Sequence, residues 1–211
     1  MAVIHHTVLK PTKLELLTSW LPSRPWYRGG ADARPELAKA GGFRLDDPEG
    51  AVGIEFLVVT DAAGPGSYLV PLAYRGAPLD GAEHALVGTM EHGVLGRRWA
   101  YDGMRDPVLV AQLLALIEGR VEAQDQSVSD TPDRDVTRSC AGGPLAFTGH
   151  LATDDEEGTV LASPSGPALR LHRVLRPAED AVPAGAIGHV AGSWTAPDGT
   201  RARGLFATLR P

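Results

Sequence analysis

Residues 94–119 read VLGRRWAYDGMRDPVLVAQLLALIEG, and this stretch carries the densest local signals in the chain. In residues 98–101, large and smaller side chains alternate with the period of two that a pleated strand requires. Asp102-Gly103 is typical turn chemistry. Asp106 then provides an N-cap for a helix that has Pro107 at its first position. The stretch therefore predicts a strand, a turn and a helix in close succession.

The predicted helix is strongly apolar, since Gln112 is the one polar side chain between residues 108 and 117. A helix that is apolar on all sides is buried inside a fold. We expect one set of its side chains to pack on a sheet and a second set to meet other parts of the protein. The first set is Leu109, Leu113, Leu116 and Ile117, and the second is Val110 and Leu114. This pattern locates a core but indicates no catalytic motif.

The composition is that of a globular protein with many turns. Of the 211 residues, 43% are hydrophobic and 22% are charged, which is ordinary globular usage. Glycine and proline are abundant, at 25 and 17 residues, and this favours short elements joined by turns. The composition therefore predicts a β-rich fold.

Charge and hydropathy narrow the choice of partners. The net charge is −6 with neither sign gathered in a block, so we expect no nucleic-acid partner. Apolar runs fall well short of the roughly 20 residues of a membrane span, and a secretory leader pattern is absent. We therefore expect a cytoplasmic protein without a membrane partner. Cys140 is the single cysteine, so an internal disulfide is excluded, and we interpret it as a packing or surface residue.

The rest of the N-terminal half alternates between helix and hairpin signals. An edge strand or extended arm is predicted near residues 1–9, and an amphipathic helix is predicted from Thr12 to Pro22. GIEFLVVT is the best strand in the chain, and SYLVPLAYRG is its antiparallel partner, with an edge or bulge at Pro71. The remaining predictions are a short helix in residues 35–40, stopped by two glycines, and a hairpin of residues 85–90 with the strand that ends at Tyr101.

The C-terminal part reads as a series of short strands. Residues 129–133 form a clear break, so we predict two units, residues 1–126 and residues 135–211. A hairpin turn is predicted at Pro197-Asp198-Gly199. The acidic run of residues 154–157 is interpreted as a solvated loop tip. The predicted strands of this part are residues 136–140, 145–151, 158–161, 168–175, 186–194 and 202–209.

Several residues are candidates for binding, and none for catalysis. Trp26, Tyr27 and Arg28 could stack on a sugar or a base, although aromatic side chains after a helix more often attach a loop to the core. Arg98 and Trp99 are further candidates. The sequence has no nucleophile elbow, Walker loop or dinucleotide fingerprint, and its histidines lack metal-site spacing. We therefore predict no catalytic residue, no metal and no cofactor.

Four segments together carry a family resemblance: KLELLTSWLPSRPWYRG, GIEFLVVTD with SYLVPLAYRG, ALVGTMEHGVLGRRWAYDGMRDPVLVAQLLALI and, more faintly, ALRLHRVLRP. They resemble the N-terminal cap region of actinobacterial maltokinases and its stand-alone relatives. The resemblance implies an α+β fold in which an antiparallel sheet packs against helices, with a cystatin-like topology. It further implies that a small β-rich unit resembling a kinase small lobe follows the cap.

Two departures from the kinase pattern decide the expected activity. If residues 168–177 correspond to the strand of the small lobe that carries a lysine, Arg170 takes the place of that lysine, and a guanidinium does not replace a compact ammonium. The catalytic-loop Asp and Asn and the magnesium-holding Asp have no counterpart, and the chain stops at Pro211, where a large lobe would begin. Phosphoryl transfer needs such a metal and base, so we expect that this chain alone is not a kinase.

The resemblance therefore predicts a non-catalytic binding or regulatory protein. Its expected partner is an enzyme of α-glucan, maltose or trehalose metabolism, and homo-oligomerisation stays open. Two alternatives stand beside this prediction. One is a split sugar kinase that a second chain or a homodimer interface completes. The other is a small-molecule module that binds a sugar or nucleotide through Trp26, Tyr27, Arg28, Arg98 and Trp99.

Overall fold

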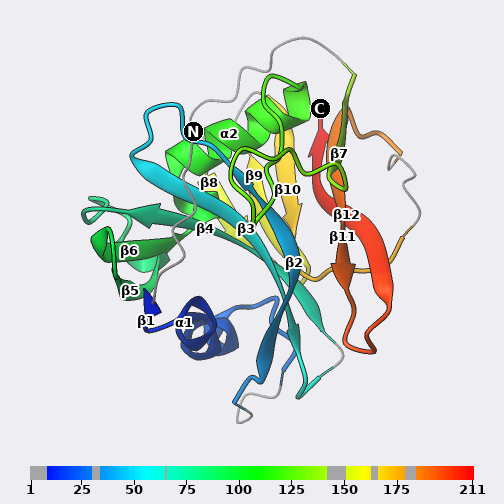
Figure 1. The fold of residues 1–211 in the computed structure, drawn as a ribbon. Coiled ribbons are helices and arrows are strands. Elements are labelled where there is room, and N and C mark those ends of the chain that lie inside the picture. The colour runs from blue at the N-terminus through cyan, green and yellow to red at the C-terminus, as the bar shows by residue number, and fades with distance from the viewer. Residues whose placement is uncertain (1–8, 30–33, 65, 142–150, 163–165, 179–183) are drawn as a thin grey trace.

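The computed structural model describes residues 9–29, 34–64, 66–141, 151–162, 166–178 and 184–211. Within these ranges the chain is mostly antiparallel sheet with few helices, as predicted for a β-rich α+β protein (Figure 1). In chain order the elements are β1 (Leu9–Lys10), α1 (Lys13–Trp20), η1 (Leu21–Ser23), β2 (Leu37–Leu45), β3 (Val52–Asp61), β4 (Ser67–Arg75), η2 (Glu83–Ala85), β5 (Leu86–His92), β6 (Gly96–Asp102), η3 (Gly103–Arg105), α2 (Pro107–Glu118), β7 (Thr137–Cys140), β8 (Leu151–Asp154), β9 (Gly158–Ala162), β10 (Ala168–His172), β11 (Gly188–Thr195) and β12 (Arg201–Arg210).

The described strands form one long sheet made of two groups. Its order is β1-β5-β6-β4-β3-β2-β11-β12-β10-β9-β8, and β7 pairs with β11. The first six strands in this order come from the N-terminal half, and the others come from the C-terminal part. Within the described residues, the ladder between the two groups is a single pair, Trp194 on β11 and Gly41 on β2. All these ladders are antiparallel.

The central strand β3 separates two hydrophobic clusters. Ile54, Phe56 and Val58 belong to the larger cluster, which also contains α2 and the inward side chains of the C-terminal strands. Leu57 and Val59 point to the opposite face and pack in a second cluster with α1 and the loop after it. This division of faces is the one that the period-two alternation of side chains along a strand produces.

Helix α2 has the start that the sequence predicted. The Asp106 carboxylate accepts hydrogen bonds from the backbone amides of Val108 (2.9 Å) and Leu109 (3.2 Å), and Pro107 follows as the first helical residue. Gly119 ends the helix in the left-handed region, at φ +81°. The predicted separation of its side chains into two sets is wrong, because Val110 and Leu114 lie in the same larger cluster as the first set.

Helix α1 begins with a capping box. The Thr12 hydroxyl accepts from the Glu15 amide, and the Glu15 carboxylate accepts from the Thr12 amide. Its regular turns end at Trp20, and the short helix η1 follows, so the predicted segment is helical throughout. The helix packs on the sheet through the second cluster, and its Lys13 ammonium lies 2.5 Å from the buried Glu55 carboxylate.

One predicted element is wrong. Residues 35–40 do not form a short helix, because β2 already begins at Leu37. Its pairing with β3 spans the two glycines, with a register shift between Lys39 and Gly41. The glycines thus lie inside a strand and do not stop a helix. Backbone pairing with β3 and burial of Phe43 override the weak local preference for helix.

The edge or bulge predicted at Pro71 is not formed, since this residue pairs with Phe56 without a register shift. Its strand β4 is central, and β4 pairs with β3 along its length. On its other side the ladder with β6 begins at Leu72, whereas Leu69 donates its amide to the Arg173 carbonyl at 2.9 Å. Pro71 lies between these two partners, where its missing N–H leaves no ladder bond unmade.

The remaining strand predictions are largely confirmed. The hairpin of β5 and β6 and the turn between β11 and β12 are formed as expected. Residues 1–8 and 142–150 lie outside the described ranges, so the predictions for the N-terminal arm and for most of the strand in residues 145–151 fall there. The structure describes only the C-terminal end of each of these two predicted elements. The end of the arm belongs to β1, and the end of the strand is the start of β8.

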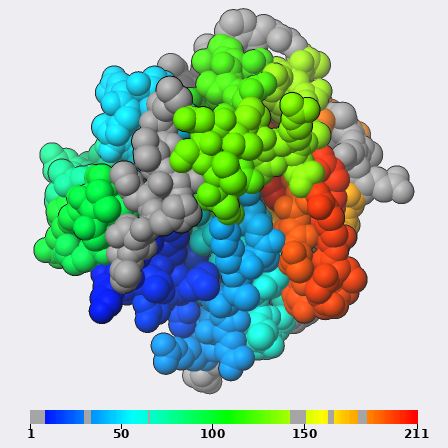
Figure 2. Space-filling model, viewed as in Figure 1, coloured from blue at the N-terminus to red at the C-terminus, as the bar shows by residue number. Residues whose placement is uncertain are grey.

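The connection after α2 lies across the sheet. Figure 2 shows this light-green segment over the upper part of β2, where Arg44 and Gln124 exchange two backbone hydrogen bonds of 2.9 Å. The larger hydrophobic cluster contains side chains from both predicted units, such as Phe43 and Phe206, whose rings stack with centroids 6.1 Å apart. The division into two units stays a prediction.

Neither α1 nor α2, nor any other helix in the described ranges, has the length and apolar character of a membrane crossing.

Candidate functional site

The loop after α1 places its three candidate residues in different surroundings. Trp26 is fully buried between Trp20 and Tyr68, at centroid distances of 5.8 and 6.1 Å. Tyr27 donates a hydrogen bond of 2.6 Å to the Asp61 carboxylate, and burial together with this bond raises the pKa of Tyr27 well above its ordinary value. Trp26 therefore attaches the loop to the core.

Arg28 points toward the C-terminal strands. Its guanidinium forms an ion pair with Glu157 in the turn between β8 and β9. The Arg176 guanidinium binds both oxygens of the same carboxylate, at 3.0 and 3.2 Å. Beside it, Arg170 and Asp155 form a two-pronged ion pair with distances of 3.1 and 2.6 Å. The turn therefore gathers arginines from two segments, the loop after α1 and the stretch from β10 to residue 176.

These ion pairs lie at a pocket of about 630 Å³. Its walls include Asp155, Glu156 and Glu157 of the turn and the outward side chains of β10, Arg170 and His172. The alternating residues of β10, Leu169 and Leu171, point the other way and are fully buried. The pocket thus lies on the outer face of the C-terminal strands, opposite the core.

The electrostatics of the pocket follow from these contacts. The hydrogen bonds from Arg170 lower the pKa of Asp155 to about 2, so this carboxylate is ionised throughout the physiological range. Burial, assisted by the positive charge of Arg170, lowers the pKa of His172 to about 4. His172 is therefore neutral at pH 7, and its Nε2 lies 3.2 Å from the Thr208 hydroxyl.

The acidic run of residues 154–157 is therefore more than a solvated loop tip, and this interpretation is corrected. Asp154 binds Arg105 at 3.1 Å and accepts from the Thr159 hydroxyl at 2.6 Å. Asp155 and Glu157 hold the arginines described above. The sequence could not show this, because the arginine partners are 15 to 129 residues away along the chain.

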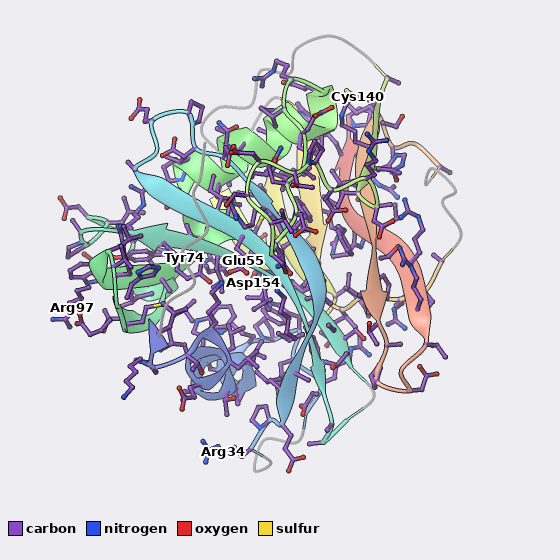
Figure 3. All side chains as sticks on the ribbon, viewed as in Figure 1. Arg34, Glu55, Tyr74, Arg97, Cys140 and Asp154 are labelled. Atoms are coloured by element: carbon purple, nitrogen blue, oxygen red, sulfur yellow. The ribbon has the colours of Figure 1, made fainter. Side chains whose placement is uncertain are left out.

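The other two candidates lie elsewhere. Arg98 and Trp99 are on β6, which pairs with β4 and β5 in the N-terminal group of strands. The guanidinium of Arg97, seen at the periphery in Figure 3, lies over the Trp99 ring at 5.4 Å. The structure therefore places Arg170 in the pocket lining and brings Arg28 beside it through Glu157, but leaves Arg98 and Trp99 outside the pocket. Whether any of these residues binds a ligand stays a prediction.

A buried ion pair that the sequence analysis missed lies next to this region. Arg173 has no exposed surface, and its guanidinium lies 2.5 Å from Asp102 Oδ1. It also donates to the Thr159 hydroxyl at 2.9 Å and lies over the Trp26 ring at 5.0 Å. One signal was available, because Arg173 continues the inward positions of Leu169 and Leu171 in steps of two.

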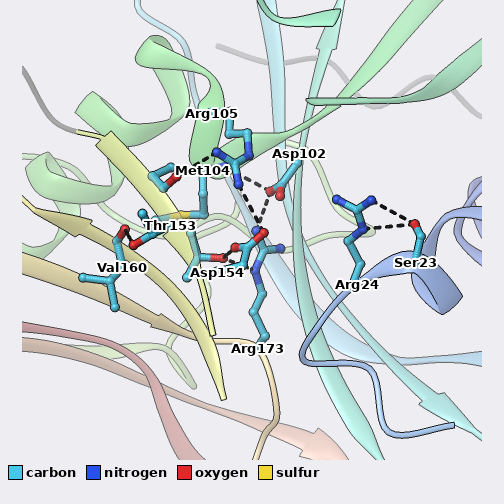
Figure 4. A network of polar contacts seen from close by, with 11 residues as sticks. Ser23, Arg24, Asp102, Met104, Arg105, Thr153, Asp154, Val160 and Arg173 are labelled. Carbon is cyan, nitrogen blue, oxygen red and sulfur yellow. Dashed lines mark hydrogen bonds and ion pairs between the residues drawn. The ribbon is translucent and has the colours of Figure 1, made fainter. Parts of the chain in front are cut away.

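This pair is the centre of a polar network that joins the two halves of the chain (Figure 4). Asp102 and Arg105 come from the end of β6 and the turn before α2, whereas Asp154 and Arg173 come from the C-terminal strands. Arg105 reaches Asp154 and donates to the Ala152 carbonyl at 2.9 Å. Each arginine is matched by one aspartate, so the buried network is neutral.

Glu55 is another buried carboxylate, and its partners are also side chains of the fold. In Figure 3 it lies beside Tyr74 near the centre of the molecule, and the Tyr74 hydroxyl donates to it at 2.8 Å. Burial and the charge of Glu55 raise the pKa of Tyr74 well above its ordinary value. Among the described residues, no group of three or more His, Cys, Asp or Glu side chains is arranged to hold a metal ion.

Comparison with protein families places these features in context. Residues 20–106 match the model of the maltokinase N-terminal cap domain. The match runs from the last residue of α1 to the N-cap of α2, and so includes Trp26, Asp102 and the strands β2 to β6. The predicted resemblance is thereby confirmed for this segment, which is less than half of the chain. A search of the curated proteins found no match.

Proposed function

We propose that this protein is a non-catalytic binding or regulatory protein of α-glucan, maltose or trehalose metabolism, located in the cytoplasm. It docks on an enzyme in the way that a cap lies on its kinase. The observation that carries this proposal is the match of residues 20–106 to the maltokinase cap. A role through contact follows from the position of that domain, which lies ahead of the catalytic machinery in the kinases that the sequence resembles.

The charged side chains around the pocket support a role without chemistry. Arg170 would occupy the lysine position of a kinase small lobe, but its carboxylate partner is Asp155 in the turn between β8 and β9. In active protein kinases that lysine is instead paired with a helix glutamate while it contacts the phosphates. Asp102, Asp154 and Glu157 are likewise held by arginines. These carboxylates serve the fold and are not poised as general bases.

The hairpin of β5 and β6 is the place where we propose the contact with the enzyme. Val94 and Leu95 at its tip are 61% and 45% exposed, and both lie within the segment that matches the cap. His92 Nδ1 accepts hydrogen bonds from their two backbone amides, at 3.3 and 3.1 Å. The tip is thereby held in one shape, which lowers the entropic cost of binding a partner.

The test is affinity purification of the tagged protein from its native cells. We expect a carbohydrate-metabolising enzyme to be enriched, and we expect the double variant Val94→Asp, Leu95→Asp to lose it. Leu151→Asp is the matched control, because Leu151 is 71% exposed and lies outside the cap segment. The proposal fails if no such enzyme is enriched over an untagged control, or if both variants retain it equally.

The split-kinase alternative has its own test. The purified chain is incubated with ATP and maltose, with and without the extract of cells that lack its gene. ATP consumption that requires both the chain and the extract would favour a split kinase over a non-catalytic partner.

A further inference from the structure

The pocket beside β10 has a feature that the proposed docking role does not use. Its charged groups are half exposed, with 34% and 48% of the Arg170 and Asp155 side chains accessible, so a ligand can reach them. Three carboxylates line or flank it, those of Asp155, Glu156 and Glu157. Two guanidinium groups in the lining, those of Arg170 and Arg176, and that of Arg28, which pairs with Glu157 from outside the lining, balance them.

This balance disfavours an anionic ligand. A phosphate would have to take Arg170 from Asp155, with which it already makes two charge-assisted hydrogen bonds, or Arg176 from Glu157. The freed carboxylate would then repel the phosphate at short range. His172 adds no positive charge at pH 7, because its pKa is lowered to about 4.

The remaining surfaces of the pocket favour a ligand of mixed character. Val174, Ala178 and Leu205 contribute apolar surface to the lining, which we call the apolar floor of the pocket. Each paired carboxylate retains lone pairs that can accept from a hydroxyl, and each arginine has further N–H donors. A saccharide or cyclic polyol presents both donors and acceptors on its hydroxyls and an apolar face of C–H groups. Among the described residues, no Phe, Tyr or Trp side chain lines the pocket for a nucleobase to stack on.

From this arrangement of neutralised charges over an apolar floor, we infer that the pocket binds a neutral polyhydroxylated small molecule and excludes phosphorylated ones. The inference does not rest on the proposed docking role. The hairpin tip and the pocket belong to different groups of strands, so either can fail while the other stands.

The test is calorimetric titration of the full chain with maltose, trehalose and myo-inositol as neutral probes, and with inorganic phosphate and ATP as anionic probes. We expect at least one neutral probe to bind in the millimolar range or tighter, and neither anion to do so. Leu205→Trp, which fills the floor, should weaken that binding at least tenfold. Retained affinity in this variant would overturn the assignment to this pocket.

Asp155→Asn gives a second, opposite readout. With its carboxylate removed, Arg170 is available to an anion, so we expect inorganic phosphate to bind at least tenfold more tightly than to the unaltered chain. Asp135→Asn is the matched control, because it breaks a more exposed pair with Arg201 outside the pocket, and it should leave both affinities unchanged. The inference is overturned if all three neutral probes fail to bind. It is also overturned if phosphate or ATP binds the unaltered chain as tightly as the neutral probes bind it, or if Asp155→Asn leaves phosphate binding unchanged.

Discussion

At the scale of single residues, the pair of Arg173 and Asp102 dominates the energetics of the interior. Both side chains are almost fully buried, at 0% and 2% exposure. Removal of one partner leaves the other as an uncompensated buried charge. We expect Arg173→Met to lower the free energy of unfolding by about 3 to 5 kcal/mol, measured by urea denaturation.

The control for this prediction is Arg176→Met. Its guanidinium also pairs with a carboxylate, but the side chain is 64% exposed. A surface pair of this kind contributes less than about 1 kcal/mol. If the two variants were equally stable, the buried pair would not have the role that its geometry indicates.

His172 should impose a pH dependence on stability. Its pKa is lowered to about 4 in the folded chain, against about 6.5 when unfolded. The unfolded chain therefore binds the extra proton between these values, and stability falls as the pH drops from 6.5 toward 4. Between pH 7 and pH 4.5, we expect the free energy of unfolding of the His172→Gln variant to fall by about 2 kcal/mol less than that of the unaltered chain. Parallel stability curves for the two proteins would contradict this prediction.

At the scale of elements, strand β2 depends on its glycines. Gly42 has φ +120°, and a Cβ at this position would lie 2.0 Å from the Phe56 carbonyl oxygen of β3. An alanine must therefore push the two paired strands apart. We expect Gly42→Ala to cost at least about 2 kcal/mol by thermal or urea unfolding.

Gly64→Ala is the control for Gly42→Ala. In the described part of the chain, no atom lies within 4 Å of the position that a Cβ of residue 64 would take, and Gly64 needs no positive φ. Its replacement should change stability by less than about 0.5 kcal/mol. If the two alanine variants lost equal stability, the close contact between β2 and β3 would not be the cause of the loss.

At the scale of the whole molecule, the larger hydrophobic cluster joins both predicted units. Phe43 of β2 stacks with Phe56 of β3 on one side and with Phe206 of β12 on the other, and the buried network adds Asp102 and Arg173 across the same boundary. We expect one cooperative unfolding transition, with coincident tryptophan fluorescence and far-ultraviolet circular dichroism curves in urea. Two separated transitions would show instead that the predicted units are stable independently.

Local sequence patterns determined much of the fold. The alternation in β3, the Asp106-Pro107 start of α2 and the Pro197-Asp198-Gly199 turn depend on contacts within a few residues, and each is formed as predicted. The same signals carried the resemblance to the maltokinase cap. They are short-range, so a single sequence records them directly.

The tertiary structure decided what depends on distant partners. Residues 37–40 became a strand because β3 lies beside them. Arg28 and Arg170 meet at one turn because the connection between β8 and β9 places Glu157 and Asp155 beside them. Ion pairing and ladder formation join groups that lie tens of residues apart in the chain. Their specificity is therefore set by the folded arrangement, and no local pattern in the sequence encodes it.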